Sequence, residues 1–187
     1  MKKFMLVFLC LGMMFSVAFA SEQKQEAADK WEISMMPKET AKETERNKWS
    51  LILENNLGIY AYDNTSVRFV RDKQGKKNLN QVEADIKTVF VNKDTLKQID
   101  AKYTKQLKKG DTASYCLIHM IFNTADKTYK ATSMQVFSKK GRELESKTTN
   151  AKFVPIPEKS FAEAMLEVVN QYVADNKADM LLNINAK

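Results

Sequence analysis

Two side chains of this sequence could take part in covalent or metal chemistry, Cys116 and His119. His119 is the only histidine of the 187-residue chain, and the second cysteine, Cys10, lies in an N-terminal segment that we expect to be removed. Residues three apart in a β-strand point to opposite faces of the sheet, so His119 cannot serve Cys116 as a general base. One histidine and one cysteine also cannot make a zinc site of His and Cys ligands. We therefore predict no nucleophilic centre, no metal site and no cofactor.

Two common arrangements for acid–base catalysis are a pair of carboxylates and a histidine beside a serine and an acid. Asp63, Asp85 and Asp100 stand singly in the sequence, so they suggest no acid–base pair. The spacing also contains no nucleophile elbow and no phosphate-binding loop. We predict that the protein is not an enzyme. His119 is expected to be a half-buried, satisfied residue of a sheet, and Cys116 a small apolar core residue.

The first twenty residues are typical of a cleaved export signal. Lys2 and Lys3 precede an apolar run over residues 4–17, and Ala18-Phe19-Ala20 provides the small residues of a cleavage site. We predict cleavage between Ala20 and Ser21, with export of the mature chain and no transmembrane segment after cleavage. An uncleaved anchor is the alternative, but the run is shorter than the roughly 20 apolar residues of a membrane span.

The charge of the chain limits its partners. The formal net charge of +7 falls to +5 once Lys2 and Lys3 are removed with the signal. Most of the cations are lysine, which lacks the planar fork that arginine uses to grip phosphate, so we predict no specific nucleic-acid binding. A weak attraction to an anionic envelope surface fits this charge, and so does a lysine-rich surface that serves solubility alone.

The hydrophobic pattern divides the mature chain into three parts. Residues 21–48 carry many charges and few apolar groups, which predicts a polar tether, with Trp31 expected to dock on the domain or to serve a partner. Residues 49–175 are expected to form a single α+β domain, and residues 176–187 a flexible tail.

Within the domain, alternating apolar residues predict strands and a 3.6-residue period predicts two helices. One helix is expected over residues 94–109, between a cap at Asp94 and Gly110, and a second should begin at Ser160, where Glu163 completes a capping-box spacing. Residues 72–81 are expected to be a mobile loop. We predict an antiparallel sheet of about six or seven strands, with the C-terminal helix packed on it and one additional helix between strands. Strands are expected over residues 49–54, 58–63, 66–71, 86–91, 113–123, 128–137 and 142–148.

Several short motifs along the domain resemble those of a known family, the surface-adhesin protein E family of Gram-negative envelope proteins. These motifs are Trp49, Tyr60-Ala61-Tyr62-Asp63 with Ser66, Tyr115-Cys116, Gly141, and Pro155-Ile156-Pro157 with Ser160. The resemblance covers residues 49–175. It implies a small domain with an antiparallel sheet and a C-terminal helix behind a signal peptide, located in the periplasm or at the cell surface, and binding to host matrix proteins.

The chain departs from the family pattern in two places. Many relatives pair a cysteine near Cys116 with one beside the last helix, and residues 161–175 contain none here. Phe153 stands where an aromatic residue, often tryptophan, precedes the Pro-Ile-Pro segment in the family.

These observations lead to two functional hypotheses for a non-catalytic envelope protein. The first is an adhesin-like module that binds a macromolecule through a sheet edge or loop surface. The alternative is a periplasmic small-ligand-binding protein with a pocket between helix and sheet. We expect Tyr60, Phe69 or Phe90 to line the pocket if the alternative is right, and a filled core with a flat exposed patch if the first is right.

Overall fold

The computed structural model describes residues 41–182 of the chain. The predicted signal peptide with its cleavage site at Ala20 and Ser21, and Trp31 in the predicted tether, lie outside these residues. The end of the predicted tether, Ala41–Lys48, is a helix, α2, which leads directly into the first strand. Along the described chain no helix is long and apolar enough to cross a membrane.

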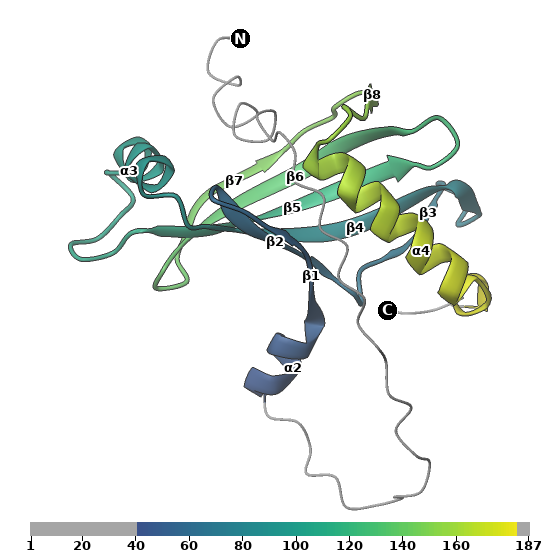
Figure 1. Ribbon diagram of the computed structural model, residues 1–187, viewed down its shortest axis with the longest axis horizontal. Coiled ribbons are helices and arrows are strands. Elements are labelled where there is room, and N and C mark those ends of the chain that lie inside the picture. The colour runs from purple at the N-terminus through teal and green to yellow at the C-terminus, as the bar shows by residue number, and fades with distance from the viewer. Residues whose placement is uncertain (1–40, 183–187) are drawn as a thin grey trace, which may run out of the picture.

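An antiparallel sheet of eight strands forms the body of the domain (Figure 1), which confirms the predicted α+β class. Six strands follow one another in the order β1-β2-β4-β5-β6-β7, while β3 pairs with β4 and β8 pairs with β6. The strands are β1 (Trp49–Glu54), β2 (Gly58–Asp63), β3 (Arg68–Arg71), β4 (Lys77–Phe90), β5 (Ala113–Asn123), β6 (Thr128–Ser138), β7 (Glu143–Thr148) and β8 (Val154–Pro155).

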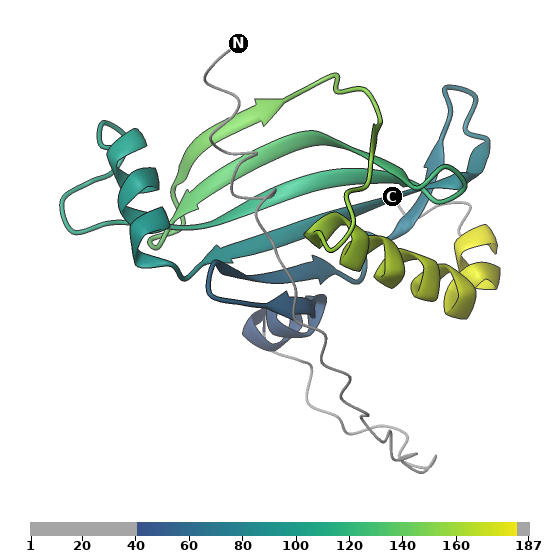
Figure 2. The same ribbon diagram turned by 45° about the horizontal axis from the view of Figure 1, so that its top comes forward.

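Helices α3 (Lys93–Lys102) and α4 (Phe161–Leu182) lie toward opposite ends of the sheet (Figures 1 and 2). The face that they cover carries the core side chains of the central strands, among them Ile86 of β4 and Ile118 of β5, which are paired and buried. Phe161, at the start of α4, packs on this face with its ring centroid 4.9 Å from that of Tyr60. We call the other side of the sheet the open face, because neither α3 nor α4 lies on it.

Strand β4 is longer than the sequence predicts. It begins at Lys77 rather than at Ile86, so the predicted mobile loop over residues 72–81 is wrong for its second half. Residues 77–81 are mostly polar, and Leu79 among them is exposed, because they lie at the sheet's periphery. Arg71 and Val70 of β3 pair there with Lys77 and Asn78 and supply backbone hydrogen bonds. Only residues 72–76 remain as the hairpin turn between β3 and β4.

The helix between strands is shorter than predicted and has a different cap. α3 ends at Lys102 instead of Lys109, with Tyr103 as its C-cap, and its N-cap is Asn92 rather than Asp94. The Asn92 side chain accepts hydrogen bonds from the backbone of Asp94 and Thr95, at 3.0 and 2.9 Å. Gly110 does adopt the left-handed conformation, with φ of 74°, but in the loop beyond the helix.

The C-terminal helix begins where the capping box predicts and continues further than predicted. Ser160 Oγ accepts a hydrogen bond from the Glu163 N–H at 3.2 Å, whereas the Glu163 carboxylate bonds to the Lys159 N–H rather than to that of Ser160. The expected tail boundary at Asn176 is a kink inside α4, where φ is −119°. Met180 beyond the kink is buried, so the prediction of a flexible tail is wrong for residues 176–182.

The extra length of α4 is held by a contact that is remote in sequence. Lys77, the first residue of β4, donates hydrogen bonds from Nζ to the carbonyls of Met180 and Leu181, at 2.5 and 2.7 Å. A cation at this position satisfies carbonyls that a helix leaves unpaired at its C-terminus and lies at the negative end of the helix dipole.

Candidate functional site

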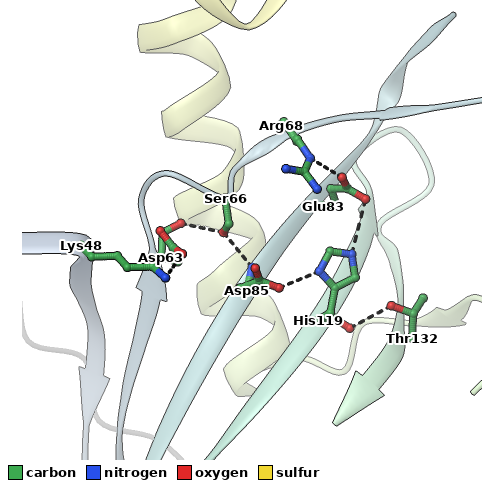
Figure 3. A network of polar contacts seen from close by, with 8 residues as sticks. All are labelled: Lys48, Asp63, Ser66, Arg68, Glu83, Asp85, His119 and Thr132. Atoms are coloured by element: carbon green, nitrogen blue, oxygen red, sulfur yellow. Dashed lines mark hydrogen bonds and ion pairs between the residues drawn. The ribbon is translucent and has the colours of Figure 1, made fainter. Parts of the chain in front are cut away.

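Two places in the domain gather functional side chains: a polar network on the open face and an apolar cavity beneath α3. The polar network is centred on His119 (Figure 3). His119 Nδ1 lies 2.7 Å from Asp85 Oδ1, and its Nε2 lies 3.4 Å from Glu83 Oε2. Glu83 and Asp85 are two apart in β4 and therefore project from the same face of the sheet beside β5. Arg68 of β3 forms an ion pair with the other oxygen of Glu83.

This arrangement keeps His119 charged. Hydrogen bonds to Asp85 and Glu83 raise the pKa of His119 to about 9, against the opposing effect of burial. Burial alone would raise the pKa of Glu83, but the hydrogen bonds from His119 and Arg68 lower it. With a carboxylate on each ring nitrogen, the imidazolium has neither nitrogen available to accept a proton from a substrate. The network therefore works as a partly exposed ion cluster that ties β3, β4 and β5 together.

The same network reaches the turn between β2 and β3. Ser66 Oγ donates to the Asp63 carbonyl at 2.7 Å and accepts from the Asp85 N–H at 2.8 Å, so this hydroxyl is committed to the backbone. The Asp63 carboxylate pairs with Lys48 at 3.0 Å and accepts from the Thr65 N–H at 2.9 Å. These contacts make Asp63 and Ser66 turn-forming residues.

The sequence interpretation of the carboxylates is thus wrong for Asp85, which has Glu83 and His119 as neighbours. The signal was the alternation of Glu83 and Asp85 with the apolar Val82, Ala84 and Ile86. It was missed because the strand was predicted to begin only at Ile86. Asp100, the third carboxylate considered, lies on α3 and accepts the Ala113 N–H at 2.6 Å, which fastens the helix to the start of β5.

An apolar cavity of about 110 Å³ lies between α3 and the sheet. Tyr60 of β2 and Phe90 of β4 line it, together with Cys116 of β5. Phe69, the third aromatic residue predicted for a pocket, does not line this cavity and is buried in the core. Cys116 is only 6% exposed and lies in the wall of the cavity, as a small apolar residue would.

The roof of the cavity is α3, and its attachment to the sheet is polar. Ile99 and Lys102 of α3 face the cavity, and Lys102 Nζ also pairs with Glu145 of β7 at 2.8 Å. Tyr103, directly after the helix, donates its hydroxyl to the same carboxylate. Burial, together with this bond to Glu145, raises the pKa of Tyr103 to about 12. The phenol therefore stays protonated and remains a donor at physiological pH.

Most of the residues that line the cavity are apolar. An apolar cavity of about 150 Å³ in another protein stays dry and binds benzene, so one of this size and lining accommodates an aromatic ring or a short alkyl chain. Among residues 41–182, no group of three or more His, Cys, Asp or Glu side chains is placed to hold a metal ion.

Comparison of the chain with protein families, with curated proteins and with solved structures finds no match. The resemblance to the surface-adhesin protein E family therefore stays a prediction, and the case for a function rests on the cavity and on the open face.

Proposed function

We propose that this protein is an exported, non-catalytic binding protein that holds a small apolar ligand between α3 and the sheet. The observation that carries the proposal is the apolar cavity lined by Tyr60 and Phe90, two of the aromatic residues expected at such a site. Well-packed cores leave few voids larger than a water molecule, so a hollow under one helix alone needs an explanation. A small apolar ligand that fills the cavity explains the hollow, because burial of apolar surface drives the binding of such a ligand.

The position of His119 supports a binding role over a catalytic one. Its two ring nitrogens lie against Asp85 and Glu83, on the face of the sheet opposite the cavity. The only histidine thus lies on the other side of the sheet from the cavity beneath α3.

Ligand binding can be tested with a neutral fluorescent probe, N-phenyl-1-naphthylamine, titrated into the purified exported protein. Val136→Phe places a ring in the cavity and should abolish the fluorescence enhancement. Val89→Phe is the matched control, because Val89 projects from the open face of β4 and its neighbour on β5 is Tyr115. Enhancement that is equal in both variants would mean that the probe binds elsewhere, and would contradict the proposal.

A second candidate function, macromolecule binding, is favoured by the open face. Lys87 Nζ lies 5.1 Å from the ring centroid of Trp49 and 4.7 Å from that of Tyr115, and Tyr115 stacks on Phe137. Leu51 beside them is 62% exposed. Large aromatic residues such as Trp49, Tyr115 and Phe137 are enriched at protein interfaces, which supports an adhesin-like module for host matrix proteins.

Protease accessibility on intact cells tests the location that the second function requires. Cleavage without lysis would place the protein at the cell surface and support binding assays on immobilised matrix protein with Leu51→Glu as the variant. Protection until lysis, with a known periplasmic protein as control, would exclude the adhesin-like function and leave a periplasmic ligand-binding role.

A further inference from the structure

The loop after α3 and the hairpin between β6 and β7 lie side by side at the end of the sheet where the cavity is (Figure 1). The Lys139 N–H donates to the Thr112 carbonyl at 2.8 Å, and Arg142 Nη1 donates to the Gln106 carbonyl at 2.9 Å. These bonds hold residues 104–112 and 139–142 together as one surface. We call this surface the cationic end of the domain.

The cationic end carries six basic side chains, and only Lys140 interacts electrostatically with the one acid among these residues, Asp111. Asp111 is the only acidic residue of the two segments, and its carboxylate is turned inward, where it accepts the N–H groups of Thr112 and Lys140. None of the six basic residues forms an ion pair with any residue between 41 and 182, and five of them are exposed, Arg142 being half-buried. They are Lys105, Lys108, Lys109, Lys139, Lys140 and Arg142.

This surface begins where the cavity wall ends. Lys102 and Tyr103 line the cavity, and the chain then turns through Gln106 and Leu107, whose N–H groups both bond to the Tyr103 carbonyl at 2.9 Å. Lys105 therefore lies within one turn of the cavity wall, and the other cations follow on the same two segments. An apolar cavity and a surface with a large excess of positive charge thus share one end of the domain.

We propose that the ligand of the cavity is a single-chain amphiphile with an anionic head group. Its apolar chain enters the cavity beneath α3, and its head group lies over the cationic end. This inference rests on the proposed function, because it names the class of ligand that the cavity takes.

The two parts of such a ligand contribute differently. Burial of the chain supplies most of the affinity. Lysine ammonium groups are hydrated point charges, so they favour an anionic head group over a neutral or cationic one without fixing it in a single geometry. At exposed positions this preference is screened by salt, with a Debye length of about 8 Å at physiological ionic strength.

The test uses n-octanoate, n-octanol and n-octylamine, which share one chain and differ in head-group charge, with affinities measured by displacement of N-phenyl-1-naphthylamine. The exported protein should bind octanoate most tightly and octylamine least. Simultaneous substitution Lys105→Gln, Lys108→Gln and Lys109→Gln should weaken octanoate binding about fivefold at low salt and leave octanol binding unchanged. The control is Lys73→Gln, Lys76→Gln and Lys177→Gln, which removes the same charge from exposed positions outside the cationic end and should leave octanoate affinity close to that of the unaltered protein.

The possible outcomes distinguish the proposal of an anionic head group from the proposal that the cavity binds a ligand. Equal affinity for octanoate and octanol, or equal losses in the two triple variants, would overturn the anionic head group while a ligand-binding cavity stands. If the probe does not bind and isothermal titration calorimetry detects no binding of the three compounds, the proposed function is overturned as well.

Discussion

The two helices on one face of the sheet are attached to it in opposite ways. α4 buries six side chains, including Phe161, Met165 and Val169 at 1% exposure or less, whereas no residue of α3 is buried. α4 is held by apolar packing along its length, and α3 by the Asn92 cap, the bond of Asp100 and the pairing of Lys102 with Glu145. Hydrophobic burial therefore stabilises the domain mainly at the α4 end. α3 covers the cavity and contributes less buried apolar surface to the free energy of unfolding.

The largest expected effect comes from truncating an apolar side chain under each helix. Phe161→Ala should lower the free energy of unfolding by about 3–5 kcal/mol, because it leaves a hole against Tyr60 in a filled core. Ile99→Ala on α3 should cost about 1 kcal/mol, since Ile99 is half-buried and already borders empty space. Urea unfolding of both variants measures the difference, and equal losses would contradict the contrast between the helices.

Replacing a valine by phenylalanine at each end of the domain tests whether there is space for a larger side chain. Val169→Phe should destabilise the domain by about 1–3 kcal/mol, because the α4 side of the core has no space for a ring. Val136→Phe should change stability by less than about 1 kcal/mol, since the cavity of about 110 Å³ accepts much of the added volume. Thermal unfolding in the absence of any ligand is the measurement. A large loss in Val136→Phe would mean that the cavity is too rigid to be filled.

The ion cluster lies on the far side of β4 and β5, and it makes stability depend on pH. The pKa of His119 is raised in the folded protein from 6.5 to about 9, so its contribution is complete below pH 6.5 and is lost as pH rises through about 9. With allowance for its partial exposure, we expect a loss of roughly 1–2 kcal/mol between pH 6.5 and 9.5. His119→Gln should remove this dependence. Urea unfolding of the unaltered protein and of His119→Gln at pH 6.5 and 9.5 measures this dependence. If the free energy of unfolding changed equally with pH in the two proteins, the carboxylates would not bind the imidazolium.

The smallest expected effects come from removing the N-cap of each helix. They distinguish local opening of one helix from global unfolding of the domain. Ser160→Ala removes the N-cap of α4 and should lower global stability by about 1 kcal/mol, because α4 is part of the core. Asn92→Ala removes the N-cap of α3 and should instead speed hydrogen exchange of α3 amides about fivefold, with little change in the global transition. If Asn92→Ala lowered global stability as Ser160→Ala does, α3 would belong to the cooperative core.

Sequence reasoning succeeded for elements whose signals are local and failed where the partner is distant. The strand over Ala113–Asn123 and the start of α4 after Ser160 were predicted, because alternation and capping chemistry act between near neighbours. The extension of α4 to Leu182 was missed, since it depends on burial of Met180 and on the contact with Lys77, 103 residues away in sequence from Met180. The polar start of β4 was missed for the same reason, because β3 supplies its pairing.

The sequence by itself determined the class of fold, through periods of two and of 3.6 residues that fix which side chains must face a core. It also determined which reactive side chains the mature chain contains, namely one histidine and one cysteine in residues 21–187. Only the tertiary structure decided where these residues lie. Pairing of β4 with β5 brought Glu83 and Asp85 to His119, and the short helix α3 left Cys116 in the wall of a cavity. The physical reason is that strand pairing and helix placement depend on burial summed over the whole domain, which no local pattern of residues encodes.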